Sequence, residues 1–278
     1  MMKKSLFVFA IAALIPSFIS HGQSVRFRNG QLNLTKYFEG FRGSFAIYDL
    51  KDNVYLQYNP DTCGMRFTPC STFKIPNSLI ALETGIAADT SFVIRYDSLI
   101  HPINPALLGL DPFKHWPHDQ TMTTAFRYSV VWYYQEIAKK IGSSRMQQYL
   151  DSLQYGNEDI SAGIDHFWLG GSLQISTSEQ VVLMTELVEN RLHGFSVSTQ
   201  QKVKDLMLLE STPVYKLYGK TGGCDCSPES TIGWFVGFIE VGPRTYAFAL
   251  NVFVDSFADL HGKRIELTKE ILHGMGII

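Results

Sequence analysis

The chain has 278 residues, of which 45% are hydrophobic and 18% are charged; this ordinary globular composition excludes a disordered or a fibrous protein. Its 24 basic and 26 acidic residues give a net charge of −2. No basic excess is present to neutralise a phosphate backbone, so we expect no nucleic-acid partner. A polytopic membrane protein is excluded as well, because the only long uncharged apolar run lies at the extreme N-terminus.

That N-terminal run is typical of an export signal. Lys3 and Lys4 precede the apolar residues 6–15, and the small residues Ser20 and Gly22 suit a cleavage site. We expect residues 1–22 to be a signal peptide and residues 23–278 to form one mature domain, periplasmic or secreted and without a stable membrane partner. An uncleaved membrane anchor is the alternative.

The first half of the mature chain contains a predicted hairpin and a predicted helix. Residues 43–50 and 53–58, joined by Lys51 and Asp52, are predicted to form a β-hairpin. Residues 71–85 carry an apolar stripe with helical spacing and end at Gly85, which suits a C-terminal cap. Residues 90–118 hold four prolines and should be mostly irregular.

The second half returns to helices and then to strands. Helical periodicity is found at 121–141, 143–153, 176–192 and 196–210, strands are expected near 214–219, 231–240 and 244–254, and a last helix at about 261–274. Strands therefore occur at both ends, and helices fill the middle. We predict an α+β fold in which one antiparallel sheet, built from both chain ends, is flanked by helices and carries an all-helical insertion, with the functional site at the seam.

The cysteines and histidines do not predict a metal site. Four cysteines fit an oxidising compartment, but three pairings are possible and the sequence does not choose among them: Cys63, Cys70, Cys224 and Cys226. The nearest ligand group, His115-x-x-His118-Asp119, is interrupted by Pro117 and lacks a further ligand set. No Gly-rich phosphate loop is present either. We therefore expect no metal and no nucleotide cofactor.

Ser71-Thr72-Phe73-Lys74 opens the first strong helix. The i, i+3 spacing puts the Ser71 hydroxyl and the Lys74 amine on one helical face, close enough to share a proton. A helix N-terminus also favours a developing negative charge. By itself this pattern equally describes a capping serine followed by a solvated lysine.

Two further motifs favour the catalytic interpretation of Ser71 and Lys74 over that of a capping serine and a solvated lysine. Ser129-Val130-Val131 supplies a second hydroxyl that can relay a proton, and Lys220-Thr221-Gly222 follows a predicted strand. The second motif offers a cation, a hydroxyl and a backbone with little side chain, along which a substrate can pair.

The ordered set of Ser-x-x-Lys, Ser-x-Val and Lys-Thr-Gly resembles the penicillin-recognising serine enzymes. With two additional motifs, over roughly residues 40 to 278, the chain is identified as similar to the class D (oxacillinase-type) serine β-lactamases. These motifs are Tyr155-Gly156-Asn157 and Phe167-Trp-Leu-Gly-Gly-Ser-Leu-Gln-Ile-Ser176.

The resemblance implies hydrolysis of β-lactam antibiotics through an acyl-enzyme on Ser71. The backbone N–H groups of Ser71 and Gly223 would form the oxyanion hole, and Ser129, assisted by Lys220, would protonate the leaving nitrogen. The substrate carboxylate would be bound by Thr221, Gly222 and Arg264. A shift of one position, to Lys263, is the alternative for the arginine. Tyr155-Gly156-Asn157 is interpreted as a turn that shapes the cavity wall.

Lys74 raises a chemical problem, because an ordinary lysine, with a pKa of about 10.4, is protonated at pH 7 and cannot act as a base. Burial lowers that pKa. In class D enzymes the neutral amine takes up CO2, and the resemblance implies that the carbamate on Lys74 is the general base. Its expected pocket consists of Phe73, Val131, Trp168 and Leu169, with the Trp168 indole N–H donating to the carbamate.

Two other functions remain open from the sequence. One is the sensor domain of a β-lactam-responsive receptor, which stays acylated and resembles Ser-x-Asn at the middle motif. An Asn there would hydrogen-bond Lys74, and Val131 cannot. The other is a D,D-peptidase with the same nucleophile. The sequence does not determine the substrate spectrum or the oligomeric state.

Overall fold

The computed structural model describes residues 28–227, 230–260 and 262–278. The predicted signal peptide, residues 1–22, lies outside this part of the chain. Among the described residues, no helix combines the length and the apolar character needed to cross a membrane.

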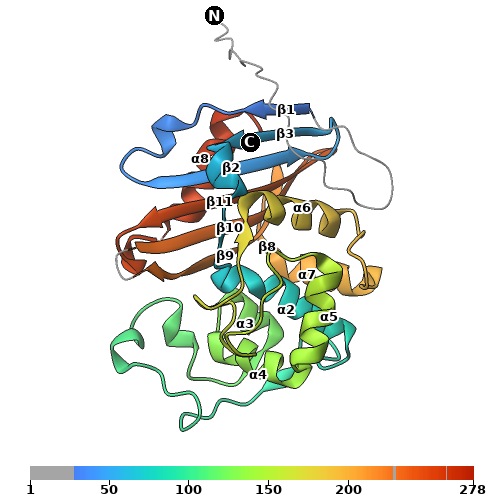
Figure 1. The fold of residues 1–278 in the computed structure, drawn as a ribbon, viewed down its shortest axis with the longest axis vertical. Coiled ribbons are helices and arrows are strands. Elements are labelled where there is room, and N and C mark those ends of the chain that lie inside the picture. Colours follow the sequence, from blue (N-terminus) through green and yellow to red (C-terminus); the bar gives the residue numbers. More distant parts are fainter. Residues whose placement is uncertain (1–27, 228–229, 261) are drawn as a thin grey trace, which may run out of the picture.

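A seven-stranded sheet brings the two ends of the chain together (Figure 1). All neighbouring strands are antiparallel except β1 and β3, which pair in parallel. The predicted α+β class and the sheet built from both chain ends are confirmed, and the parallel β1 is an addition that the sequence did not predict. In spatial order the strands are β1 (Arg28–Gln31), β3 (Val54–Tyr58), β2 (Arg42–Asp49), β11 (Arg244–Val254), β10 (Ser230–Val241), β9 (Tyr215–Ser227) and β8 (Leu208–Ser211).

The strands in the middle of the sheet bury both faces. In β10, Trp234 and Val236 belong to one hydrophobic core, whereas Phe235 and Ile239 belong to the other. Because side chains alternate along a strand, one continuous apolar run can serve both cores. The helix α6 (Thr177–Val188) covers one face, and α8 (Lys263–Gly274) covers the opposite face (Figure 1).

The remaining helices form the predicted insertion, below the sheet in Figure 1. They are α2 (Lys74–Glu83), α3 (Met122–Arg127), α4 (Val131–Ile141), α5 (Ser143–Leu153) and α7 (Val197–Met207). The short helix α1 (Pro60–Gly64) lies instead beside β2 of the sheet. Two small two-stranded sheets are also present. They pair β4 (Arg66–Phe67) with β7 (Ile175–Ser176), and β5 (Val93–Ile94) with β6 (Gln120–Thr121).

Short 3₁₀ helices complete the described elements: η1 (Thr35–Tyr37), η2 (Cys70–Phe73), η3 (Pro105–Leu107), η4 (Phe113–His115) and η5 (Phe257–Leu260). The element η2 lies directly before α2, so the helix predicted at 71–85 begins with a tighter turn.

The structure corrects two predicted helices. The segment 121–141 is two helices, because Ser129 takes a left-handed conformation with φ of 56° and interrupts the helix between α3 and α4. The segment 196–210 stops being helical at Met207, and Leu208 turns extended to start β8, which pairs with β9. In both places tertiary contacts override helical periodicity.

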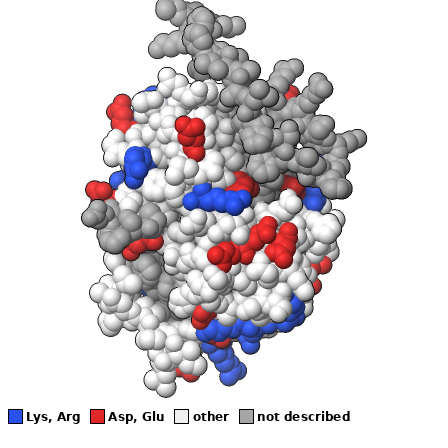
Figure 2. Space-filling view, in the orientation of Figure 1, with Lys and Arg blue, Asp and Glu red and all other residues white. Residues whose placement is uncertain are grey.

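Charges of both signs are spread over the face drawn in Figure 2. On the face drawn in Figure 2, Lys and Arg side chains form small groups separated by acidic and uncharged residues. This distribution agrees with the near-neutral composition and gives that face no extended field of one sign.

Candidate active site

The segment η2–α2 carries the predicted nucleophile and its neighbouring amine. Lys74 Nζ donates a hydrogen bond of 2.8 Å to Ser71 Oγ. The 3₁₀ turn and the first turn of α2 follow each other without a break, so the i, i+3 spacing brings the two side chains together. The predicted Ser71–Lys74 contact is thus present, and Lys74 is not the solvated cation of the alternative interpretation.

Lys74 is fully buried, with 0% of its surface exposed. Burial lowers the pKa of its amine to about 7, because removal of water disfavours the charged form. The ring of Tyr134 lies with its centroid 5.4 Å from Nζ. An amine in this setting is substantially neutral at physiological pH and can act as a base or as a nucleophile.

A second lysine–serine pair reaches the site from the other side of the fold. Lys220 on β9 donates a hydrogen bond of 3.0 Å to Ser129 Oγ, which is held at the break between α3 and α4. Burial, and then the positive charges of Lys74 and Arg264, hold the pKa of Lys220 well below its usual range. Ser129, whose left-handed backbone breaks the predicted helix, therefore contacts strand β9 of the sheet through its hydroxyl.

Strand β9 passes very close to the nucleophile segment. A Cβ added at Gly222 would lie 2.9 Å from the Pro69 carbonyl oxygen and 3.2 Å from the Thr72 nitrogen. The third residue of the Lys-Thr-Gly motif must therefore be glycine. This approach puts β9 against the turn that carries Ser71, next to the predicted oxyanion-hole residue Gly223.

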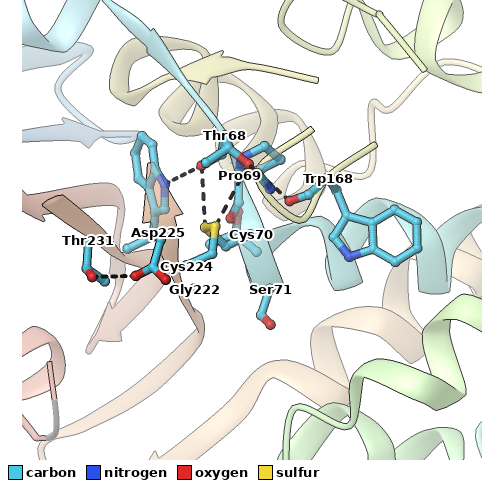
Figure 3. Close-up of a disulfide and its surroundings, with 12 residues drawn as sticks. Thr68, Pro69, Cys70, Ser71, Trp168, Gly222, Cys224, Asp225 and Thr231 are labelled. Carbon is cyan, nitrogen blue, oxygen red and sulfur yellow. Dashed lines mark hydrogen bonds between the residues drawn. A yellow bond between two sulfur atoms is a disulfide. The ribbon is translucent and has the colours of Figure 1, made fainter. Parts of the chain in front are cut away.

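A disulfide between Cys70 and Cys224 fixes the same junction (Figure 3). Its Cα atoms are 5.8 Å apart. Cys70 adjoins Ser71 and Cys224 adjoins Gly223, so the bridge flanks both predicted oxyanion-hole residues. The structure thereby selects one pairing that the sequence left open. Cys63 is a buried free thiol, and the side chain of Cys226 lies outside what the structure describes.

Arg264, in the first turn of α8, faces the same strand. It donates through its terminal nitrogen to the Gly222 carbonyl oxygen. Burial lowers its pKa to about 10, so the guanidinium stays charged at neutral pH. The adjacent Lys263 is exposed, so the structure brings Arg264, and not Lys263, to Gly222.

Trp168 lies beside the nucleophile helix. Its ring is fully buried and stacks on Phe73, with the ring centroids 5.4 Å apart. Within the described residues its indole N–H has no hydrogen-bond partner. Leu169 packs at the edge of the same core, and Val131 is half-buried at the start of α4.

The Tyr155-Gly156-Asn157 turn supports the segment that bears Trp168. The amide of Asn157 donates to the Ser172 carbonyl oxygen at 2.8 Å and accepts from the Gln174 nitrogen at 2.7 Å. Tyr155 is buried with its ring edge against Phe73. These contacts join the turn to the segment that bears Trp168 and to the ring of Phe73.

Sequence reasoning missed Thr68. This residue binds the Trp168 segment through its hydroxyl and β10 through its carbonyl group. A threonine between a two-residue strand and a proline belongs to no periodic pattern, so the sequence carried no indication of it. Among the residues the structure describes, no three His, Cys, Asp or Glu side chains are arranged to hold a metal ion.

Comparisons with known proteins place the chain among its relatives. Residues 33–272 match the family model of the penicillin binding protein transpeptidase domain. The chain is 41% identical to the β-lactamase OXA-48 of Klebsiella pneumoniae, over 79% of this chain and 78% of that protein. The class D β-lactamase YbXI from Nostoc superposes with a TM-score of 0.80 at 37% identity, covering 88% of this chain and 98% of the other.

A solved receptor domain is also similar. The C-terminal domain of the Bacillus licheniformis BlaR penicillin receptor has a TM-score of 0.81 and 31% identity, covering 90% of this chain and 97% of the other. The fold is thus shared by proteins named as β-lactamases and by a domain named as a penicillin receptor.

Proposed function

The chain belongs to the class D serine β-lactamase family, and from this membership we propose that it hydrolyses β-lactam antibiotics through an acyl-enzyme on Ser71, with a carbamate on Lys74 as the general base. The observation that carries the proposal is the fully buried Lys74 amine, 2.8 Å from Ser71 Oγ. A neutral amine in contact with a hydroxyl is the arrangement that activates a serine.

The pocket around Lys74 fits a carbamate. The buried indole N–H of Trp168 finds no partner among the described residues, and an unpaired buried donor of this kind costs about 1–3 kcal/mol. A carbamate oxygen next to Lys74 would accept from it. When present, the carbamate supplies a carboxylate-type base at the end of a side chain that is otherwise an amine.

Acylation then follows from the positions of the chain's own groups. Ser71 Oγ loses its proton toward the Lys74 side chain as it attacks the lactam carbonyl carbon, and the lactam C–N bond breaks. The Ser129 hydroxyl is positioned to protonate the leaving nitrogen. Because the pKa of Lys220 is lowered, its amine releases a proton more readily than an ordinary lysine and can restore the one on Ser129.

The charge of the site suits an anionic substrate. Arg264 stays charged at neutral pH and donates to the Gly222 carbonyl oxygen of β9, where Thr221 adds a hydroxyl. The planar fork of Arg264 matches a carboxylate on the substrate. We assign the substrate carboxylate to Thr221, Gly222 and Arg264, and the acyl oxygen to the backbone N–H groups of Ser71 and Gly223.

A β-lactam sensor is the second candidate, favoured by the likeness to the BlaR domain. A sensor forms the same acyl adduct on Ser71 but does not hydrolyse it. Val131, where sensors resemble Ser-x-Asn, has no amide to bind Lys74. We therefore place hydrolysis first and propose export to the periplasm or beyond as its setting.

Intact-mass spectrometry after mixing with benzylpenicillin tests the proposal. We expect an adduct of one penicillin mass that appears within milliseconds to seconds and disappears as the antibiotic is consumed. Ser71→Ala should give no adduct and no turnover of a chromogenic cephalosporin. An adduct that persists without turnover would indicate the sensor, and turnover by Ser71→Ala would refute the nucleophile.

A further inference from the structure

Thr68 holds the backbone on both sides of Leu169. Its hydroxyl donates to the Trp168 carbonyl oxygen at 3.1 Å and accepts from the Gly170 nitrogen at 3.0 Å. A hydroxyl can do both at once, because it offers one donor and two acceptor positions. Gly170 has a φ of +83°, so the chain turns sharply here and its N–H folds back toward Thr68.

The main chain of Thr68 is anchored on the opposite side. Its carbonyl oxygen accepts from the indole N–H of Trp234 on β10 at 2.9 Å, and both of these residues are buried. The sulfur of Cys224 in the disulfide lies 3.9 Å from Thr68 Oγ1. Thr68 therefore joins the sheet, the disulfide and the Trp168 segment, just ahead of Ser71 in the chain (Figure 3).

The Trp168 indole has little freedom of its own. Its ring is fully buried, stacked on Phe73 and met at an edge by Phe167, with centroid distances of 5.4 and 4.9 Å. With the ring confined in this way, the position of the indole N–H follows that of the Trp168 backbone. In the view of Figure 3 the ring nitrogen is on the edge nearer to Ser71.

We propose that Thr68 is a positioning residue that sets the indole N–H of Trp168 beside Lys74 and so determines how tightly Lys74 retains CO2. This inference rests on the proposed function, because it concerns the same carbamate. The hydroxyl of Thr68 bonds the backbone of Trp168 and Gly170; it acts by fixing the Trp168 backbone relative to the turn that carries Ser71 and Lys74.

The surroundings explain why loss of the hydroxyl would alter the site more than the fold. Gly170 is exposed, so its freed N–H can turn to water and the Trp168 segment can relax. Valine has nearly the shape of threonine, and the Thr68 carbonyl would keep its bond to Trp234. Outer groups that orient a site's direct ligands usually change its affinity by about 10-fold or more.

The experiment is a titration of the purified enzyme with ¹³C-labelled bicarbonate, with the carbamate followed by ¹³C NMR. We expect Thr68→Val to need about tenfold more bicarbonate than the wild type for half occupancy, and Thr68→Ser, which keeps the hydroxyl, to stay within about twofold. Thr185→Val is the matched control, because this threonine is also buried and its hydroxyl bonds a backbone carbonyl of its own helix; it should behave as wild type.

The outcomes separate this inference from the proposed function. Half occupancy of Thr68→Val at the wild-type bicarbonate concentration would overturn the role of Thr68 and leave the carbamate intact. An equal weakening in Thr68→Ser would overturn it too. If the wild type itself shows no carbamate signal, the result contradicts the proposed function, in which a carbamate on Lys74 is the general base. Should Thr68→Val not fold, Thr68→Ala, which adds no bulk, is titrated in its place.

Discussion

Lys74 Nζ lies 2.8 Å from Ser71 Oγ, and the lysine side chain has no exposure to solvent. These two facts depend on each other. The 3₁₀ turn η2 directs Ser71 inward at the start of α2, and the core around Phe73 and Tyr134 excludes water from the amine. The low pKa of Lys74 is a consequence of this packing, and the predictions below follow from it.

The rate should fall as the pH is lowered through 7. Below a pKa of about 7 the Lys74 amine is protonated and cannot hold CO2, so we expect kcat to drop roughly tenfold per pH unit between pH 6.5 and 5. Enzyme kept at pH 5 and returned to pH 7.5 should recover faster and more fully with added bicarbonate. Recovery that ignores bicarbonate would contradict a carbamate on Lys74.

Removal of the buried amine should stabilise the fold while it abolishes activity. The pKa of Lys74 is about 7 when folded and about 10.4 when unfolded, so between these values the unfolded chain binds more protons and stability rises with pH. The full cost of burying the amine is therefore present below pH 7. In CO2-free buffer at pH 6 we expect Lys74→Met to raise the unfolding free energy by about 1–3 kcal/mol.

Urea unfolding at pH 6 and pH 9 tests the predicted direction of this pH dependence of the unfolding free energy. The gain from Lys74→Met should shrink at the higher pH, where the wild-type amine is neutral in the folded protein. A gain that does not depend on pH would mean that packing, and not protonation, is responsible.

The disulfide between Cys70 and Cys224 should contribute strongly to stability. It closes a separation of 154 residues, and removing such a bridge costs about 2–5 kcal/mol. We expect the double variant Cys70→Ala/Cys224→Ala to lose this amount in denaturant unfolding. It should also acylate more slowly, because Ser71 and Gly223 are then no longer joined through their neighbours.

The free thiol provides the control for that comparison. Cys63→Ala removes a buried sulfur without breaking a bridge and should leave the acylation rate unchanged. A double variant as stable and as fast as wild type would show that β9 and η2 are held together by packing alone.

Val131→Asn should convert the enzyme toward a receptor. An amide at the start of α4 would bond the Lys74 side chain and hinder its return to the carbamate, so the acyl-enzyme should accumulate and kcat should fall by about 10- to 100-fold. Stopped-flow kinetics with a chromogenic cephalosporin would show a burst followed by a slow phase. Val131→Thr, which has the same shape and no amide, should keep a steady rate; unchanged kinetics in Val131→Asn would refute the comparison with sensors.

Much of the fold follows from local patterns in the sequence. The hairpin β2–β3 and the strands β10 and β11 are apolar runs rich in aromatic and β-branched residues, and the helices α5, α6 and α8 carry apolar stripes. The fold class and the contact between Ser71 and Lys74 were therefore predictable. The break at Ser129 was not, because a left-handed serine leaves no trace in helical periodicity; it is stabilised by its contact with Lys220, ninety-one residues away.

The parts of the site that depend on distant contacts were out of reach. The pairing of Cys70 with Cys224 can be predicted only if it is known that β9 crosses η2. The close backbone approach at Gly222, which leaves no room for a side chain, follows from the same crossing. Thr68 is a further case, since its partners Trp168 and Trp234 come from two separate parts of the chain. Such residues act through tertiary position and not through any spacing in the sequence.

The most direct test of the central claim is the pKa of Lys74 itself. NMR titration of the enzyme with ¹³C-labelled lysine side chains, in CO2-free buffer and with Lys74→Met to assign the resonance, would measure it. The account predicts a titration near pH 7. A resonance that titrates above pH 10, as an ordinary solvated lysine does, would contradict it.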